Sequence, residues 1–191
     1  MNKIELTNCD CEILKQQNAF IMNNDLFQKY YEMRPIDCQY CNMFGKKIPV
    51  PRRCKSYGAN YKFNGSSDNE KTEPFDESME LMSEIIAKSL NCEKPNNCLV
   101  NWYADGDEYI GYHQDVEKTI SNNKSVCIYS FGAERKMKFK NINNNKVDDV
   151  VLENNSLFIM LPETNEKTKH SIPKSKKIKN ARISFSFRWM K

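Results

Sequence analysis

Apolar residues recur with helical spacing in two segments of the first half of the chain. Residues 25–33 follow Asn24, an N-capping residue type, and carry four apolar side chains on one face: Leu26, Phe27, Tyr30 and Met33. Residues 76–90 show the same spacing at Met79, Met82, Ile86 and Leu90. The pattern predicts two helices, each with one face packed on the rest of the protein.

From residue 98 onward the pattern changes to short β-rich runs separated by Asn, Gly, Asp and Pro. Six runs are predicted as strands: residues 98–104, 126–132, 135–141, 147–153, 156–162 and 182–189. The polar stretch NINNNK at 141–146 predicts a hairpin loop. Upstream, residues 36–50 have the pattern of a hairpin with Gly45 at its turn.

These elements predict an α+β fold, in which N-terminal helices back one face of a sandwich or jelly roll. The 191 residues fit one compact domain. Within it, we expect residues 1–97 to form an extension with the helices and the hairpin, and residues 98–191 to form the core.

The chain has no apolar run of membrane-spanning length, so we expect no membrane partner. Its first residues also lack the apolar centre of a secretory signal. We therefore expect an intracellular monomer, nuclear in a eukaryote or in the host cell if the source is a virus.

The net charge of +4 permits a nucleic-acid partner without requiring one. The basic residues gather in two clusters, one in residues 46–55 and one in residues 167–179. Clusters of this kind are typical of surfaces that contact phosphates, although single lysines are usually only solvated.

Eight cysteines in an intracellular chain are expected to be free thiols or metal ligands rather than disulfides. Cys9 and Cys11 form a CxC pair, and Cys38 and Cys41 form a CxxC pair. The four thiolates could hold a structural zinc if the fold brought the pairs together. The alternative is four unpaired cysteines.

The chain contains two histidines, and their surroundings suggest a metal site. His113 precedes Asp115 by two positions, so in an extended chain both side chains point to the same side. His170 would complete a set of two imidazoles and one carboxylate. Such a set leaves coordination positions open and suits non-haem iron(II) that must also bind a chelating cosubstrate and dioxygen.

The segment RISFSFR at 182–188 alternates strictly between polar and apolar residues. One face carries Arg182, Ser184, Ser186 and Arg188, and the other carries Ile183, Phe185, Phe187 and Trp189. Inward-facing arginines are costly in an ordinary core, but they suit a site for a dicarboxylate. The alternative is an amphipathic strand with its polar face in solvent.

These residues, in this order and spacing, resemble the AlkB family of iron(II)/2-oxoglutarate dioxygenases. The shared elements are NWY at 101–103, DG at 105–106, HQD at 113–115, His170 and the final RxSxSxR. One departure is Ser184, where the family usually has asparagine. Upstream elements within residues 44–65 (FG, PR, YG and YxFxG) and HSIPKSKK at 170–177 are similar to the animal duplex-DNA-repair branch.

The resemblance implies a double-stranded β-helix core with a β-hairpin lid that recognises nucleotides. It implies iron(II), 2-oxoglutarate and dioxygen as cofactor and cosubstrates. The iron ligands would be His113, Asp115 and His170. The residues around 2-oxoglutarate would be Asn101, Tyr103, Arg182, Ser184, Ser186 and Arg188, with Arg182 on the distal carboxylate.

The resemblance also implies substrate contacts, each with a plainer alternative. Tyr61 and Phe63 would line the base pocket, or else be core residues. Glu117 would face the damaged base, or else be a solvated charge. The hairpin tip, Met43, Phe44 and Gly45, would probe the base stack, or else pack on the domain. Phosphates would be contacted by basic residues that include Arg52, Lys176 and Lys177.

Three hypotheses follow. The first is oxidative demethylation of N-alkylated bases such as 1-methyladenine and 3-methylcytosine in DNA, duplex or single-stranded, with release of formaldehyde. The second keeps the iron chemistry but acts on RNA, a protein or a small molecule. The third is a non-catalytic, zinc-containing module that binds nucleic acid.

Overall fold

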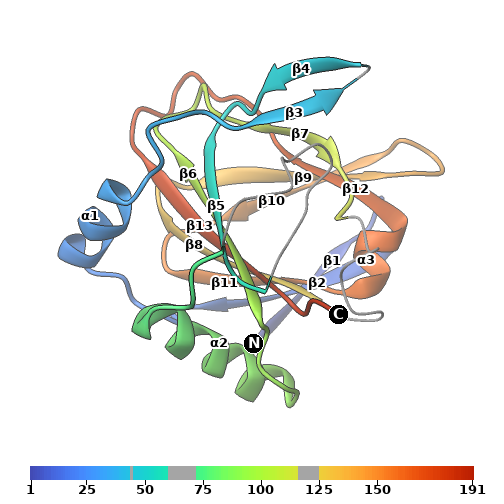
Figure 1. Ribbon diagram of the computed structural model, residues 1–191. Coiled ribbons are helices and arrows are strands. Elements are labelled where there is room, and N and C mark those ends of the chain that lie inside the picture. The colour runs from blue at the N-terminus through green and yellow to red at the C-terminus, as the bar shows by residue number, and fades with distance from the viewer. Residues whose placement is uncertain (44, 60–71, 116–124) are drawn as a thin grey trace.

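The computed structural model describes residues 1–43, 45–59, 72–115 and 125–191 (Figure 1). Within these ranges the strands form two antiparallel sheets and a separate two-stranded hairpin. In spatial order, the larger sheet consists of β1 (Asn2–Leu6), β2 (Cys11–Gln17), β11 (Ser156–Met160), β8 (Val126–Gly132), β13 (Arg182–Arg188), β6 (Asn97–Tyr103) and β5 (Arg53–Gly58).

The smaller sheet faces the larger one. In spatial order it consists of β10 (Val147–Leu152), β9 (Arg135–Asn141), β12 (Thr168–Ile172) and β7 (Ile110–His113). From β6 onward the chain passes repeatedly between the two sheets, as it does in a jelly roll. Apolar side chains of both sheets meet between them, where Phe139 of β9 stacks on Phe158 of β11. The structure therefore agrees with the predicted jelly-roll core.

Two helices cover the other face of the larger sheet: α1 (Asn24–Glu32) and α2 (Glu77–Leu90) (Figure 1). Tyr30 of α1 packs edge-on against Phe185, and its carbonyl accepts a hydrogen bond from Trp102. Met79, Met82 and Ile86 of α2 are buried, as their spacing predicts. Because helices cover one face and the smaller sheet covers the other, β6 is buried along its whole length.

The helix starts follow from their capping residues. Asn23, rather than Asn24, caps α1, and its side chain accepts the N–H of Leu26. Two asparagines stand in a row there, so the sequence could not distinguish the cap from the first helical residue. Asp76 caps α2 in the same way through the N–H of Met79. No helix in the described ranges is long and apolar enough to cross a membrane.

Several elements were not predicted from the sequence. The segments β1, β2, β5, β7 and β12 are strands, and α3 (Pro162–Lys167) is a short helix. β1 and β2 lie at one edge of the larger sheet, where partly exposed strands mix polar and apolar residues. As a result, the larger sheet combines strands from both sides of residue 97.

The predicted hairpin forms between β3 (Tyr40–Met43) and β4 (Lys46–Pro49) and projects at the top of Figure 1. Gly45 lies in its turn with φ of +73°, a left-handed conformation that glycine adopts without strain. All four residues of β4 are exposed. β4 thus faces solvent, whereas Cys41 of β3 packs against a small cluster of Val50, Cys54 and Leu99.

Candidate metal and cosubstrate site

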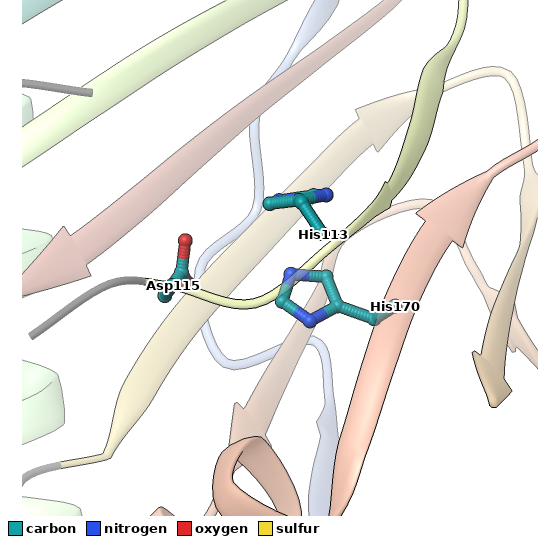
Figure 2. Close-up of side chains that lie close together, drawn as sticks. All are labelled: His113, Asp115 and His170. Atoms are coloured by element: carbon teal, nitrogen blue, oxygen red, sulfur yellow. The ribbon is translucent and has the colours of Figure 1, made fainter. Parts of the chain in front are cut away.

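The three predicted metal ligands meet between the sheets (Figure 2). His113 and His170 are cross-strand partners in the β7–β12 pair, and their ring centroids lie 4.2 Å apart. Asp115 follows two residues after His113, just beyond the end of β7. One ligand atom from each residue lies within 4.8 Å of the others. Among the described residues, no second group of three or more His, Cys, Asp or Glu side chains gathers this closely.

The structure does not bring together the four cysteines considered for zinc, Cys9, Cys11, Cys38 and Cys41, and this supports the alternative of four unpaired cysteines. Cys9 is buried against β9, where its thiol contacts Phe139 O at 3.5 Å, whereas Cys41 belongs to the hairpin. Burial, together with the carboxylate of Asp148, raises the pKa of the Cys9 thiol to about 12. This thiol therefore stays protonated at neutral pH.

The protonation states of the triad suit metal binding. Burial would raise the pKa of Asp115, but the Arg188 guanidinium and the two imidazoles outweigh it and lower that pKa to about 2. Arg188 Nη2 lies 3.1 and 3.2 Å from the two Asp115 oxygens. Burial lowers the pKa of His113, and it lowers the pKa of His170 to about 3. At neutral pH the site therefore presents a carboxylate and two neutral imidazoles, as metal ligands must be.

The hydrogen bonds of the two imidazoles leave ring nitrogens available to bind a metal. His113 Nδ1 lies 2.9 Å from Gly111 O, and in the tautomer that donates this bond Nε2 keeps its lone pair. His170 Nδ1 is buried and has no hydrogen-bond partner among the described residues. A purely structural histidine in a core is usually fully bonded. The set of two imidazoles and one carboxylate, incompletely satisfied by the protein, matches the donor set that non-haem iron(II) uses.

The triad lies on the wall of a cavity of about 430 Å³. The polar face of β13 lines the same cavity through four side chains: Arg182, Ser184, Ser186 and Arg188. The opposite face, with Ile183, Phe185 and Phe187, packs in the core beneath the helices. The predicted alternation of β13 is confirmed, and the alternative of a polar face in solvent is wrong.

Arg182 is a buried cation at this cavity. Its Nε donates to Ser130 Oγ at 2.9 Å, while Nη1 and Nη2 have no partner in the described part of the chain. Burial lowers its pKa to about 10, which leaves it protonated at neutral pH. The Tyr103 ring lies beside two guanidinium groups, 5.1 Å from that of Arg182 and 5.4 Å from that of Arg135. Two unused donors on a buried cation suit a bidentate carboxylate ligand.

Arg52 lies elsewhere than predicted. The sequence placed it on the surface against phosphates, but it is buried and lines the cavity. Its Nε donates to Asn101 Oδ1 at 2.7 Å, which fixes the Asn101 amide in the cavity wall. The contact of Arg52 with phosphates stays a prediction. Its neighbour Arg53 is only half-buried and donates to Ile36 O.

Lys176 and Lys177 are exposed in the loop after β12. This loop crosses Gly106, whose O accepts the N–H of Ser175 at 2.8 Å. A Cβ on residue 106 would lie 1.8 Å from Ser175 O, so glycine in the DG element permits the close approach. The basic loop is thus held against the turn that connects β6 to β7.

Most of the predicted base contacts cannot be placed. Phe44, Tyr61, Phe63 and Glu117 lie outside the described residues. Met43 ends β3 and Gly45 occupies the hairpin turn. Their roles stay predictions.

Several residues that line the cavity, or that hold the residues lining it, were not predicted from the sequence. Apolar side chains such as Cys41, Val50 and Ile128 line the cavity, and Ser130 holds Arg182. Gln114 and Asn165 join the Asp115 segment to α3. No pattern marks such residues, because each is a single side chain in a strand or a polar stretch and acquires its role only through the fold.

Comparison with known proteins identifies the family. The model of the 2OG-Fe(II) oxygenase superfamily matches residues 12–188. The chain is 30% identical over 157 residues to the mouse DNA oxidative demethylase ALKBH2, covering 76% of this chain and 64% of the mouse protein. It is 29% identical over 157 residues to human ALKBH2, covering 76% and 59%. The chain thus spans less than two thirds of the length of these relatives.

The fold is similar to the solved structure of OsALKBH1. The TM-score is 0.67 at 16% sequence identity, and the match covers 92% of this chain and 97% of the other. This likeness supports the fold, while the sequence matches support the family. The chain belongs to the 2OG-Fe(II) oxygenase superfamily and, within it, to the AlkB family, with similarity to ALKBH2.

Proposed function

We propose that this protein is an oxidative demethylase that repairs N-alkylated bases, such as 1-methyladenine and 3-methylcytosine, in DNA. One observation carries the proposal: a single cavity brings a buried His–Asp–His triad together with a buried arginine whose Nη groups have no partner among the described residues. Family membership implies iron(II), 2-oxoglutarate and dioxygen. The choice of DNA is supported by the similarity to proteins named DNA oxidative demethylase.

His113, Asp115 and His170 would hold the iron. When bound, iron(II) with 2-oxoglutarate and dioxygen supplies an oxidation that hydroxylates the alkyl carbon, while 2-oxoglutarate becomes succinate and carbon dioxide and the hydroxymethyl group leaves the base as formaldehyde. The protein's own task is to position the groups and to keep water away. Arg188 keeps Asp115 ionised and oriented through its paired contacts to the carboxylate.

Arg182 would bind the distal carboxylate of 2-oxoglutarate through Nη1 and Nη2. The Ser130 hydroxyl fixes the guanidinium from the other side by accepting from Nε. Asn101, Tyr103, Ser184 and Ser186 would line the rest of the cosubstrate, since all four border the same cavity. A charge-assisted bidentate contact of this kind selects a dicarboxylate over a monocarboxylate.

The base-binding side of the proposal concerns the hairpin lid. A base inside a duplex cannot reach a buried site, so it must leave the stack. We infer that Met43, Phe44 and Gly45 at the hairpin tip probe the stack, that Tyr61 and Phe63 hold the extruded base, and that Glu117 faces it. The position of the hairpin supports this arrangement, because Cys41 in β3 and Val50 just after β4 border the cavity.

Exposed lysines would hold the nucleic-acid backbone. Lys176 and Lys177 extend into solvent from the loop that is fastened to Gly106. Contacts of this type give salt-dependent binding without base readout. They suit duplex and single-stranded DNA, and RNA as well.

The test is the release of formaldehyde from oligonucleotides that carry 1-methyladenine or 3-methylcytosine. DNA single strands, DNA duplexes and the corresponding RNA single strands are compared, with and without 2-oxoglutarate. We expect release that depends on 2-oxoglutarate and is faster on DNA than on RNA, and we expect the Asp115→Ala variant to release none. Faster release from RNA would identify RNA, rather than DNA, as the preferred substrate. If the protein converts 2-oxoglutarate to succinate but releases formaldehyde from none of the oligonucleotides, its substrate is not a nucleic acid.

A further inference from the structure

The aspartate of the triad is held differently from the two histidines. His113 and His170 are partners within the β7–β12 ladder, so strand pairing fixes both. Asp115 lies beyond the end of β7, outside any strand, and the residues that follow it are not described. The buried N–H and C=O groups of Asp115 therefore need hydrogen-bond partners that no neighbouring strand supplies.

Asn165 in α3 provides those partners. Its Nδ2 donates to Asp115 O at 3.0 Å, and its Oδ1 accepts the N–H of Asp115 at 3.1 Å. Both hydrogen bonds are buried, and Asn165 itself is 7% exposed. One amide side chain thus satisfies both backbone groups of a proposed metal ligand, as an adjacent strand would.

The residue before Asp115 strengthens the same connection. Gln114 Nε2 donates to Asn165 O at 2.9 Å and to Glu166 O at 3.3 Å, so α3 and the Asp115 segment are joined by four hydrogen bonds. The helix is itself anchored on the larger sheet, where Thr164 Oγ1 donates to the Glu12 carbonyl in β2.

The helix α3 runs directly into the strand that carries the third ligand. Thr168, the first residue of β12, donates from Oγ1 to Thr164 O at 2.7 Å, two residues before His170. One continuous segment, α3 and β12, therefore carries both His170 and the group that holds the main chain of Asp115. This arrangement sets the distance between the aspartate and the histidine pair.

We propose that Asn165 is a positioning residue that fixes Asp115 for metal binding. The inference rests on the proposed iron site, but it concerns a residue outside the ligand set. Arg188 orients the carboxylate of Asp115, and Asn165 fixes the main chain from which that carboxylate extends. Loss of a partner that orients a metal ligand typically weakens metal affinity about 10- to 100-fold.

The chain offers a matched control in Asn96. Its amide makes the same pair of bonds to the main chain of Met190: Nδ2 donates to Met190 O at 3.1 Å, and Oδ1 accepts the N–H of Met190 at 2.7 Å. Asn96 does not line the cavity. Asn96→Ala therefore removes the same pair of side-chain contacts at a residue outside the cavity lining, and it keeps the main-chain bond from Asn96 N–H to Arg188 O.

The experiment measures Mn(II) affinity by calorimetry for wild type, Asn165→Ala and Asn96→Ala, without cosubstrate and without turnover. We expect Asn165→Ala to bind Mn(II) about 10- to 100-fold more weakly and Asn96→Ala to bind it as wild type does. The Co(II) absorption spectrum should change only in Asn165→Ala, because only that variant shifts a ligand. The amide hydrogen of Asp115 should also exchange faster in Asn165→Ala.

Equal Mn(II) affinity and equal Co(II) spectra in wild type and Asn165→Ala would overturn the inference and leave the iron site intact. A wild-type protein that binds neither ion would instead overturn the proposed function. If Asn165→Ala does not fold, Gln114→Ala removes the other two bonds to α3 and should weaken Mn(II) binding by a smaller factor. Unchanged affinity in Gln114→Ala would then count against the inference.

Discussion

The cavity wall formed by β13, which is the proposed cosubstrate wall, and the β3–β4 hairpin, which is the proposed lid, are built on opposite principles. On the wall, β13 is paired on both sides, by β6 and by β8, and all seven of its residues are buried. The hairpin has two strands paired only with each other, and β4 is exposed throughout. On the cavity face of β13, Arg182 Nε donates to Ser130 and Arg188 Nη2 donates to Asp115, so both guanidinium groups are held by side chains outside the strand.

This difference matches two kinds of task. A metal and a small dicarboxylate need side chains held to fractions of an ångström, which paired strands supply. An extended nucleic acid of variable sequence needs an exposed element that contacts it from outside. We therefore expect changes in the wall to abolish chemistry on every substrate, and changes in the lid to alter the choice among substrates.

The largest expected effect comes from removing a metal ligand. Asp115→Ala should reduce formaldehyde release below detection on single strands and duplexes alike, because two imidazoles alone bind iron weakly and Arg188 loses the carboxylate that it orients. Asp149→Ala, which removes an exposed aspartate paired with Lys138 on the smaller sheet, is the control and should keep full activity. Activity retained by Asp115→Ala would mean that the triad is not the metal site.

The second effect concerns the cosubstrate. Arg182→Ala should weaken 2-oxoglutarate binding by about 30-fold or more, since truncating one partner of a buried charge pair costs about 2 kcal/mol or more. Mn(II) affinity without cosubstrate should stay unchanged. Calorimetric titration with 2-oxoglutarate measures the difference, and Arg53→Ala, at a half-exposed arginine, is the comparison. Equal 2-oxoglutarate affinity in both variants would show that Arg182 does not bind the distal carboxylate.

The third effect concerns Phe44 at the hairpin tip, whose loss should affect some substrates more than others. Phe44→Ala should slow turnover of a duplex by about 5-fold or more, because one stacking contact contributes about 1–3 kcal/mol. Turnover of single strands should change less, since their bases need no extrusion. The measured quantity is the ratio of duplex to single-strand turnover. Equal losses on both substrates would rule out that the hairpin tip probes the base stack.

The smallest effect is expected at the basic loop. Replacing Lys176 and Lys177 together with alanine should weaken DNA binding equally for all sequences and reduce the salt slope by about 1 for each lost phosphate contact. Lys136→Ala, at an exposed lysine on the smaller sheet, should leave the slope unchanged. The measurement is DNA affinity as a function of salt concentration. An unchanged slope in the double variant would make these two lysines ordinary solvated side chains.

The elements with strong patterns could be predicted from the sequence. The strictly alternating β13, the two amphipathic helices and the Gly45 turn agree with the structure because periodicity and turn chemistry determine them locally. His113 and Asp115 were recognisable because their spacing alone places both on one side of an extended chain. His170 was assigned to the same set because it is the other histidine of the chain, and the resemblance then supported that choice across the 54 residues between His170 and Asp115.

Other features depend on tertiary contacts that leave no local signal. β1, the edge strand of the larger sheet, and its neighbour β2 are partly exposed and mixed in polarity, and α3 is a short polar helix whose sequence reads as a loop. Arg52 has the sequence of a surface cluster, yet it is buried against Asn101. The CxC and CxxC pairs have the spacing of a metal site, yet the fold does not bring them together.

The central claim is that one cavity holds iron through His113, Asp115 and His170 and holds 2-oxoglutarate through Arg182. Anaerobic absorption spectroscopy tests this claim directly, because iron(II) chelated by the keto acid gives a weak visible charge-transfer band. We predict the band in the wild-type protein only when iron(II) and 2-oxoglutarate are both present, no band in Asp115→Ala, and a band in Arg182→Ala only at higher 2-oxoglutarate concentrations. A wild-type protein without the band, or an Asp115→Ala variant that keeps it, would contradict the account.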